Sequence, residues 1–369
     1  MMKETPTMSA LRRSRALGAS IVALGLVAAA CGDDEPADTE AVAASTSTDA
    51  PADEPVATDA PAVTEAPGDE SADEPSEEPS DEPGAAAGGT VVIDHYSGSD
   101  EVPVDPETIV VMDLGMLVTL DALGIEADGF GSLGTPVPEQ YQALVDAPEP
   151  VGTAFEPDYE AINALEPDLI IVATRSSATY PEMSEIAPTV DLTFDESLDP
   201  IAAFEQRHEQ LGQIFGIEDE VAAELEALDA EIEALAARTG DAGSALIVLT
   251  SGAEVSAYGA GSRFGMVHDV FGYAAADETL QTEETHGEVV SFEYLLDVNP
   301  DVMFVVDRSA AIGEEAEGAE TILDNELVNQ TNAWQNERVV YVDAFSWYLA
   351  GNSIPGLRGV MADIEASLP

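Results

Sequence analysis

The sequence predicts an α/β protein of two Rossmann-like lobes with mainly parallel sheets, joined by a single long helix. Three observations predict it. Short β-rich runs alternate with helical stretches across residues 89–369, an unbroken helical pattern fills residues 218–239, and a motif of helix, turn, strand and arginine occurs twice. Alternating strands and helices are typical of parallel sheets covered by helices.

Six short β-rich runs are predicted as strands. They are Thr90–Asp94, Thr108–Met112, Leu169–Ala173, Ser244–Thr250, Val302–Asp307 and Val339–Asp343. Amphipathic segments ended by glycine lie between them, such as the stretch that reaches Gly124. A glycine directly after the last apolar position is a common signal for the end of a helix.

The segment 218–239 is predicted as the connecting helix. It lacks Gly and Pro, and Gly240 marks its end. The apolar residues that recur at helical spacing are Val221, Leu225, Leu228, Ile232 and Leu235. At about 1.5 Å per residue the helix spans roughly 33 Å, enough for a strut between two lobes. An interaction coiled coil is the alternative, but about three heptads is short for one.

The repeated motif indicates an internal duplication. Its copies are residues 160–175 (EAINALEPDLIIVATR) and 293–308 (EYLLDVNPDVMFVVDR). In both, Glu precedes Pro by seven positions and Arg by fifteen. We read each copy as a helix, a Pro-Asp turn, a buried parallel strand and an arginine just past the end of the strand.

Arg175 and Arg308 are therefore candidate ligand-binding residues. Open α/β sheets bind ligands at the carboxyl ends of their strands, so each lobe would present one arginine to a shared cleft. A surface salt bridge is the alternative for each. Residues 89–369 contain only seven basic side chains, all arginine, which weakens that alternative.

Three further strings in the second half carry candidate residues. Arg263 follows a run of small residues, His286 lies in a polar loop with glycine, and Trp347 and Tyr348 follow the strand Val339–Asp343. We expect all of them to follow strands of the second lobe toward one edge of its sheet. A solvated histidine and a packed aromatic pair are the alternatives.

The N-terminus is predicted to be a lipoprotein signal. Residues 1–30 combine a basic start with a short apolar run and small residues before Cys31, the only cysteine. Cys31 stands where a bacterial lipoprotein would carry its lipid, and two acyl chains would anchor the protein stably. The alternative is ordinary cleavage that leaves an unmodified cysteine.

Residues 31–88 are predicted to be a disordered tether after that cysteine. Positions 32–88 hold 18 acidic residues, eight prolines and no Lys or Arg, so charge repulsion and a lack of apolar side chains favour an extended chain. A cation-binding acidic tail is the alternative. The remaining chain divides into an N-terminal lobe at 89–217, the linker helix at 218–240 and a C-terminal lobe at 241–369.

The formal net charge of −63 limits the partners. Binding to nucleic acid, or to anionic lipid through a basic surface, requires clustered Lys and Arg. We therefore expect no nucleic-acid partner and no attachment to the membrane other than the lipid at Cys31. A single cysteine excludes a disulfide framework.

These residues resemble the iron-siderophore and vitamin B12 family of substrate-binding lipoproteins of ABC importers. The resemblance covers about 89–369 and is nearest to the branch that takes ferric catecholate siderophores of the petrobactin and enterobactin types. The strings that carry it are Ser262-Arg-Phe-Gly-Met-Val-His-Asp-Val, Thr285-His-Gly, Phe304-Val-Val-Asp-Arg308, Ile322-Leu-Asp-Asn and Trp347-Tyr-Leu-Ala.

The resemblance implies an extracytoplasmic protein, not an enzyme and without a cofactor, that delivers a ferric siderophore to an ABC permease, and we expect a monomer. Arg175, Arg263 and Arg308 would bind the anionic ligand, with Trp347 beside them. His286 and Tyr348 would complete the coordination of Fe(III) when the siderophore supplies four donors.

The family also docks on its permease through one surface glutamate per lobe, which corresponds here to Glu160 and Glu293. Two alternatives remain open: a haem- or corrinoid-binding protein of the same fold, and a secreted enzyme on the same scaffold. The string 129–134 matches G-x-G-x-x-G, but Pro136 and Pro138 follow it and prevent the helix that a dinucleotide site needs.

Overall fold

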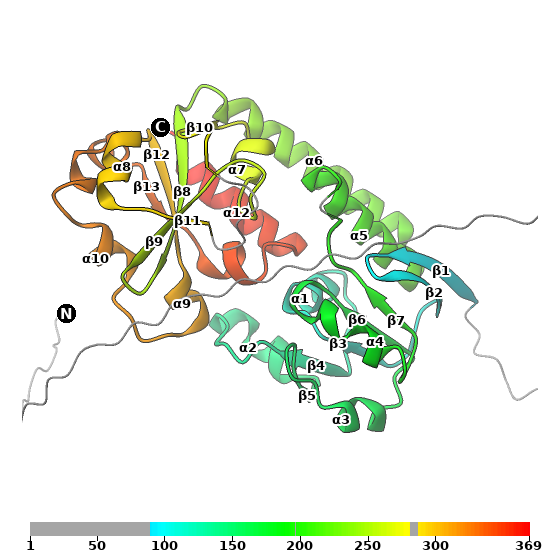
Figure 1. The fold of residues 1–369 in the computed structure, drawn as a ribbon. Coiled ribbons are helices and arrows are strands. Elements are labelled where there is room, and N and C mark those ends of the chain that lie inside the picture. The colour runs from blue at the N-terminus through cyan, green and yellow to red at the C-terminus, as the bar shows by residue number, and fades with distance from the viewer. Residues whose placement is uncertain (1–88, 196, 281–286) are drawn as a thin grey trace, which may run out of the picture. The chain divides into compact units, whose positions relative to one another are not determined.

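The computed structural model describes residues 89–195, 197–280 and 287–369 of the chain, which divides into the units Met1–Glu78 and Pro79–Pro369. The signal predicted at 1–30, the tether predicted at 31–88 and Cys31 lie outside the described residues. Within the second unit, strands and helices alternate and form two covered sheets (Figure 1), which confirms the predicted α/β class.

The first lobe is built on a five-stranded parallel sheet in the order β5-β4-β3-β6-β7. Its strands are β3 (Ile109–Val111), β4 (Gly129–Ser132), β5 (Glu149–Thr153), β6 (Leu169–Val172) and β7 (Thr189–Asp191). The helices are α1 (Leu114–Ala122), α2 (Glu139–Asp146), α3 (Tyr159–Ala164), η1 (Thr174–Thr179), α4 (Tyr180–Met183) and α5 (Pro200–Phe215). The predicted strands β3 and β6 are buried throughout and lie side by side in the sheet.

A separate antiparallel hairpin precedes this sheet. It consists of β1 (Thr90–His95) and β2 (Gly98–Pro103). The hairpin is fixed by His95, whose ring bonds Asp100 at 2.8 Å, and by the Tyr96 amide, which donates to the Asp191 carbonyl at 3.1 Å. The run Thr90–Asp94 is thus a strand, as predicted, but it is not part of a parallel sheet.

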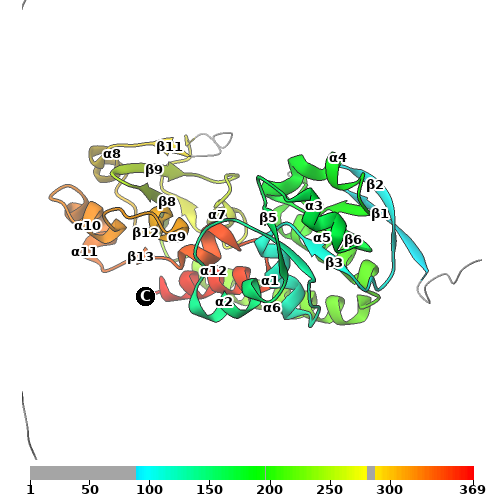
Figure 2. The same cartoon turned by 90° about the horizontal axis from the view of Figure 1, so that it is seen from below.

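Helix α1 differs from the amphipathic helix expected before Gly124. Every residue from Leu114 to Leu120 is buried, because α1 lies between the first sheet and the C-terminal helix α12 (Ile354–Ala366) (Figure 2). Gly115 permits this close approach, since a Cβ there would overlap the side chain of Asn352. A helix that is apolar all round is typical of a core position.

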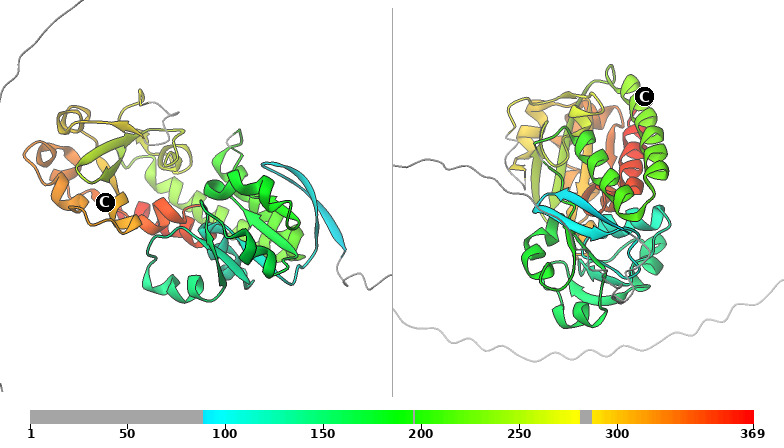
Figure 3. Two further views of the ribbon diagram at one scale, coloured as in Figure 1. Left: turned by 60° about the horizontal axis from the view of Figure 1, so that its bottom comes forward. Right: turned by 90° about the vertical axis from the view of Figure 1, so that its right-hand side faces the viewer.

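The long helix occurs as predicted: α6 covers Glu218–Thr239, and Gly240 follows it. Its buried residues include the five predicted apolar positions, which pack against the second sheet and α12. Arg358 of α12 donates to Glu224 and Glu231 of α6, which joins the two helices that Figure 3 shows side by side. Acidic residues in the first turn and Arg238 in the last complement the helix dipole.

The second lobe has a six-stranded mixed sheet in the order β11-β9-β8-β12-β13, with β10 also paired to β8. Its strands are β8 (Ser244–Ser251), β9 (Glu254–Tyr258), β10 (Ala274–Ala275), β11 (Glu288–Val289), β12 (Val302–Asp307) and β13 (Val339–Tyr341). Its remaining helices are α7 (Met266–Asp269), α8 (Phe292–Val298), α9 (Arg308–Ile312), α10 (Ala319–Leu323), η2 (Val328–Gln330) and α11 (Asn332–Gln335). Strand β9 runs antiparallel to both of its neighbours, β8 and β11. The lobe boundaries at 217/218 and 240/241 stay a prediction.

A π-helix at Phe345–Leu349 lies where the two lobes meet. Phe345 and Leu349 pack into the core of the first lobe, whereas Trp347 packs into the core of the second. The wider turn of a π-helix changes the direction of successive side chains, and such turns often occur at functional sites. Tyr348 lies between these core residues and is half-buried.

The structure supports the duplication of the helix-turn-strand motif in detail. In each copy the residue before the proline has a left-handed backbone, with φ of 50° at Glu166 and 48° at Asn299, which ends the helix. The next aspartate then binds the start of the neighbouring strand. Asp168 accepts from the Thr108 amide at 2.9 Å, and Asp301 accepts from the Ser244 amide at 3.0 Å.

We expect Asp301→Ala to lower the free energy of unfolding by about 1–2 kcal/mol, because it leaves the Ser244 amide without its charged acceptor. The pKa of Asp301 is lowered mainly by this bond to the backbone, so the carboxylate is ionised at neutral pH. Urea denaturation at pH 7 measures the change. Asp297→Ala, at an exposed position of α8, is the control; equal stability of both variants would contradict the expectation.

Candidate ligand-binding site

The two arginines of the repeat lie directly after equivalent strands. Arg175 belongs to η1 after β6, and Arg308 is the first residue of α9 after β12. Both strands are the fourth in their sheet order and run parallel to a central neighbour. The carboxyl edge of each sheet therefore presents one arginine, as the sequence predicted.

Arg263 reaches the same place by another route, which corrects the expectation that it follows a strand toward that edge. Strand β9 is antiparallel to β8, and its last residue, Tyr258, pairs with Ile247 in the middle of the sheet. The glycine-rich segment 259–265 then reverses the chain before α7. A turn, not the end of a strand, places the guanidinium of Arg263.

All three arginines converge on Tyr348. Arg175 and Arg263 donate to its main-chain carbonyl, at 3.0 and 3.4 Å. The Nε of Arg308 donates to its hydroxyl at 3.1 Å. The Arg263 guanidinium also lies 4.6 Å from the centre of the Tyr348 ring, and that of Arg175 lies 5.9 Å from it, both within cation–π range.

This cluster has little compensating negative charge. Arg308 approaches Glu314 at 3.6 Å, but within residues 89–195, 197–280 and 287–369 neither Arg175 nor Arg263 forms an ion pair. Burial lowers the pKa of Arg263, Tyr348 opposes that shift, and the neighbouring Arg175 adds to it. Cations gathered in so acidic a chain, and left without carboxylates, are suited to an anion of several charges.

Aromatic rings of Phe264, Trp347 and Phe304 pack next to the arginine cluster. Arg263 lies over Phe264 at 4.7 Å, and the ring centres of Phe264 and Trp347 are 6.3 Å apart. Trp347 stacks on Phe304 and is only 6% exposed, and its indole N–H donates to Asp363 at 2.9 Å. Trp347 therefore does not lie at the surface of the cluster but packs behind it, which corrects the prediction that it lies beside the arginines as a ligand contact.

Tyr258 is a buried supporting residue of this cluster that the sequence prediction missed. Its ring meets Phe264 edge-on at 4.8 Å. Burial raises the pKa of its hydroxyl, while the nearby charges of Arg263 and Arg308 oppose that shift. Tyr258 opens the Tyr-Gly-Ala-Gly-Ser-Arg string that ends at Arg263, and this position was the available sequence signal.

The predicted metal ligands are only partly visible. His286 lies outside the described residues, and Tyr348 is held by the arginines as given above. In the described ranges, no group of three or more His, Cys, Asp or Glu side chains could hold a metal ion.

The two predicted docking glutamates lie at equivalent exposed positions. Glu160 is the second residue of α3, and Glu293 is the second residue of α8. Each helix runs into the turn before β6 or β12, so its first residues lie toward the carboxyl edge of the sheet. A hydrogen bond from the Glu293 backbone amide and one from Ser291 lower the pKa of Glu293, which is ionised at neutral pH.

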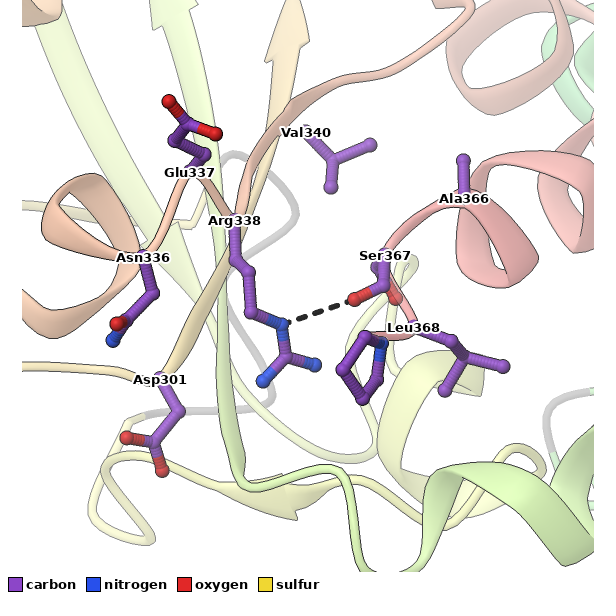
Figure 4. Close-up of a pocket in the computed structure, with 9 residues that line it drawn as sticks. Asp301, Asn336, Glu337, Arg338, Val340, Ala366, Ser367 and Leu368 are labelled. Carbon is purple, nitrogen blue, oxygen red and sulfur yellow. Dashed lines mark hydrogen bonds between the residues drawn. The ribbon is translucent and has the colours of Figure 1, made fainter.

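A hollow of about 440 Å³ around Arg338 lies away from the arginine cluster (Figure 4). It is lined by the starts of β12 and β13 and by the chain end after α12, whereas the cluster follows the carboxyl end of β12. Arg338 donates to the carbonyls of Ser367 and Ala242, at 3.0 and 2.6 Å. Its role is to fasten the end of α12.

Two α/β lobes, one connecting helix and a cluster of cations from both lobes define the class: a two-lobed binding protein. The chain belongs to the periplasmic binding protein family, whose sequence profile matches residues 109–344. In the part of the chain that the structure describes, no helix has the length and apolar content to cross a bilayer.

Relatives with known ligands cover most of the chain. The petrobactin-binding protein YclQ of Bacillus subtilis is 37% identical over 73% of this chain and 84% of its own. The ferric-anguibactin-binding protein FatB of Vibrio anguillarum is 32% identical over 74% and 86%. The crystal structure of the periplasmic catecholate-siderophore binding protein VctP of Vibrio cholerae matches with a TM-score of 0.70 at 32% identity, over 76% of this chain and 100% of its own.

Proposed function

We propose that this protein captures an anionic ferric siderophore of the catecholate class at the junction of its lobes and delivers it to an ABC permease. The observation that carries the proposal is the convergence of Arg175, Arg263 and Arg308 on Tyr348. The ligands named for YclQ, FatB and VctP support the siderophore as cargo.

The chemistry of a ferric tris-catecholate fits this cluster. The complex is a trianion with flat aromatic rings, and guanidinium groups are permanently charged, planar and weakly hydrated. Three of them can pair with catecholate oxygens while lying against the rings. Haem, by contrast, would present only two carboxylates to three arginines.

Titration of the purified protein while its tryptophan fluorescence is followed tests the proposal. We expect ferric enterobactin or ferric petrobactin to quench the emission at far lower concentrations than either iron-free compound, and ferrioxamine, a cationic chelate, to have little effect. An equal and weak response to all of them would contradict the proposal.

We infer that Tyr348 and His286 complete the iron coordination when a siderophore supplies four donors. Phenolate oxygen and imidazole nitrogen are reasonable ligands of this metal. Tyr348→Phe should then abolish the phenolate-to-iron absorption band in the visible spectrum with a four-donor catechol chelate, and leave the spectrum with six-donor enterobactin unchanged. An unchanged spectrum with the four-donor chelate would exclude Tyr348 as a ligand.

We propose that Glu160 and Glu293 dock on basic residues of the permease. Glu160→Ala should leave the affinity for ferric siderophore intact, because the side chain is exposed and is not part of the arginine cluster, and should reduce iron uptake several-fold. Radioactive iron uptake in cells that lack the native protein measures the effect. Glu166→Ala, at an exposed position in the turn after α3, is the control, and loss of siderophore binding would show that Glu160 is misplaced.

The remaining parts of the proposal concern the location of the protein. It is an extracytoplasmic monomer, cleaved after residue 30, with Cys31 lipidated and residues 31–88 holding the folded part away from the membrane. Cys31→Ser should release the protein from the membrane fraction, which fractionation followed by immunoblotting tests.

A further inference from the structure

Large apolar side chains are exposed at six described positions. They are Val92, Tyr96, Phe155, Tyr159, Leu198 and Val289. Three of the six lie within five residues of a predicted docking glutamate: Phe155 and Tyr159 beside Glu160, and Val289 beside Glu293. Single exposed apolar side chains are ordinary at protein surfaces, so what distinguishes these three is their position in the sequence next to the two glutamates.

Phe155 is held out by an ordered loop between β5 and α3. The Thr153 amide donates to the Glu156 carbonyl at 3.0 Å, and the Glu156 amide donates to the Thr153 hydroxyl at 2.9 Å. The Asp158 amide closes the loop on the Val151 carbonyl at 2.9 Å. Gly152, with φ of 86°, permits this path, since a Cβ there would overlap the backbone of residues 156–158.

The tip of this loop therefore presents Phe155 in a fixed position, 61% exposed. A flexible loop could turn an aromatic ring back onto the protein. Here the hydrogen bonds hold the backbone of the loop, so less conformational entropy is lost when the ring is bound by a partner. A pre-positioned aromatic ring is typical of an interface anchor.

The second lobe has a recess where the first has a projection. A hollow of about 410 Å³ lies directly beside Glu293, lined by the start of β9 and by residues 289–293. Val289, on strand β11 at the edge of the sheet, is 62% exposed there. The wall of this hollow is mostly apolar, with Glu254 and Glu293 at its rim.

We propose that Phe155 and the hollow beside Glu293 are apolar contacts of the permease-docking surface, which would make that surface more than a pair of ion pairs. The inference rests on the proposed function. The partner is the extracytoplasmic face of an integral membrane transport protein. Facing the first lobe, it presents an apolar recess for Phe155 with a basic side chain beside it. Facing the second lobe, it presents an apolar side chain for the hollow, again with a basic side chain beside it.

Charge complementarity supports this partner over a second copy of the chain. Phe155 is followed by Glu156, Asp158 and Glu160, and the hollow has Glu254 and Glu293 at its rim. Like charges would face each other if two copies met through these surfaces, whereas a basic partner would be attracted to both. The pairing of a projection with a recess also fixes which lobe meets which half of the partner.

Photo-crosslinking in intact cells tests the inference. The full chain carries p-benzoylphenylalanine at position 155 or, as the matched control, at position 96, where Tyr96 is 60% exposed on the β1–β2 hairpin. We expect position 155 to crosslink to a multi-spanning membrane protein that copurifies with an ABC ATPase, and position 96 not to. A crosslink to a second copy of this chain, to a soluble protein or to nothing would overturn it.

Substitutions give an independent measure. Phe155→Ser and Val289→Asp should each reduce iron uptake about fivefold or more, the loss expected of an interface anchor. Tyr96→Ser and Val92→Asp, at positions of nearly equal exposure, should not. Affinity for ferric enterobactin and the urea midpoint should be unchanged in all four variants.

The two proposals fail in different ways. If the unsubstituted protein binds no ferric siderophore, the proposed function fails. If it binds, and Glu160→Ala reduces uptake while Phe155→Ser and Val289→Asp do not, the docking surface consists of the glutamates alone and only this inference fails.

Discussion

Replacing Arg308 with alanine is expected to weaken the binding of a ferric catecholate by about 10- to 150-fold. A hydrogen bond to a charged group contributes about 1.5–3 kcal/mol, and 1.4 kcal/mol corresponds to a factor of ten in affinity. Arg308 also donates to the hydroxyls of Tyr348 and Ser251, at 3.1 and 3.3 Å. Arg308→Ala would therefore remove the proposed ligand contact and also the hydrogen bond to the Tyr348 hydroxyl.

The effect should depend on ionic strength and on the neighbouring arginines. Because Arg175 and Arg263 contact the same tyrosine, a second substitution should not add its full effect to the first. Added salt should weaken the unsubstituted protein more steeply than Arg308→Ala, since one positive charge less faces the trianion.

Fluorescence titration with ferric enterobactin at two salt concentrations measures both effects. Arg238→Ala is the matched control. Arg238 lies in the exposed last turn of α6 and pairs with Glu365 of α12, away from the cluster. Like Arg308→Ala, this variant removes one positive charge from the protein, but it leaves the three arginines of the cluster in place. Equal affinity of the two variants would show that net charge, and not the cluster, governs binding.

The fold was predictable where the sequence carries long or repeated patterns. The helix 218–239 is marked by 22 residues without Gly or Pro, and β6 and β12 are marked by the duplicated motif. Strand β4 (Gly-Phe-Gly-Ser) carries no apolar run, because a Cβ at Gly129 would overlap the side chain of Leu165 and one at Gly131 would overlap that of Met112. Its existence depends on neighbours that are distant in sequence.

The site was predictable for residues that follow a repeated strand, and less so for the others. Arg175 and Arg308 follow from topology, whereas Arg263 depends on how the segment 259–265 folds back, which no spacing shows. Trp347 and Tyr348 are adjacent, yet a π-helix places one in the core and the other among the arginines. Neighbouring residues of any helical turn point in different directions, and the sequence does not show which of the two directions faces the core.

Acidification should destabilise the protein through His208, a buried residue of α5. His208 is 0% exposed, its Nδ1 donates to the Phe204 carbonyl at 2.6 Å, and its Nε2 has no hydrogen-bond partner among the residues that the structure describes. Burial lowers the pKa of His208 to about 3; the bond to Phe204 opposes that shift, and the buried Arg207 next to it adds to it. Protonation would place a second cation and an unpaired N–H in the core.

The sign follows from the direction of that shift. The pKa of His208 is lower in the folded protein than in the unfolded chain, where it is about 6.5. The stability that depends on neutral His208 is therefore complete above pH 6.5 and is lost as the pH falls toward 3. The expected slope is about 1.4 kcal/mol per pH unit once the unfolded chain is protonated, or about 2 kcal/mol between pH 6.5 and pH 5.

Urea denaturation at pH 7, 6 and 5, a range in which most carboxylates remain ionised, measures this loss. His208→Gln removes the titrating ring and keeps an N–H that can reach the Phe204 carbonyl. The variant should be less stable at pH 7 but should lose about 2 kcal/mol less than the unsubstituted protein on going to pH 5. His268→Gln is a comparison in the same direction, because burial also lowers the pKa of His268, but the ring is only half-buried and the change should be smaller. Parallel pH profiles for the unsubstituted protein and His208→Gln would show that His208 is protonated in the folded protein without cost, and that water reaches its Nε2.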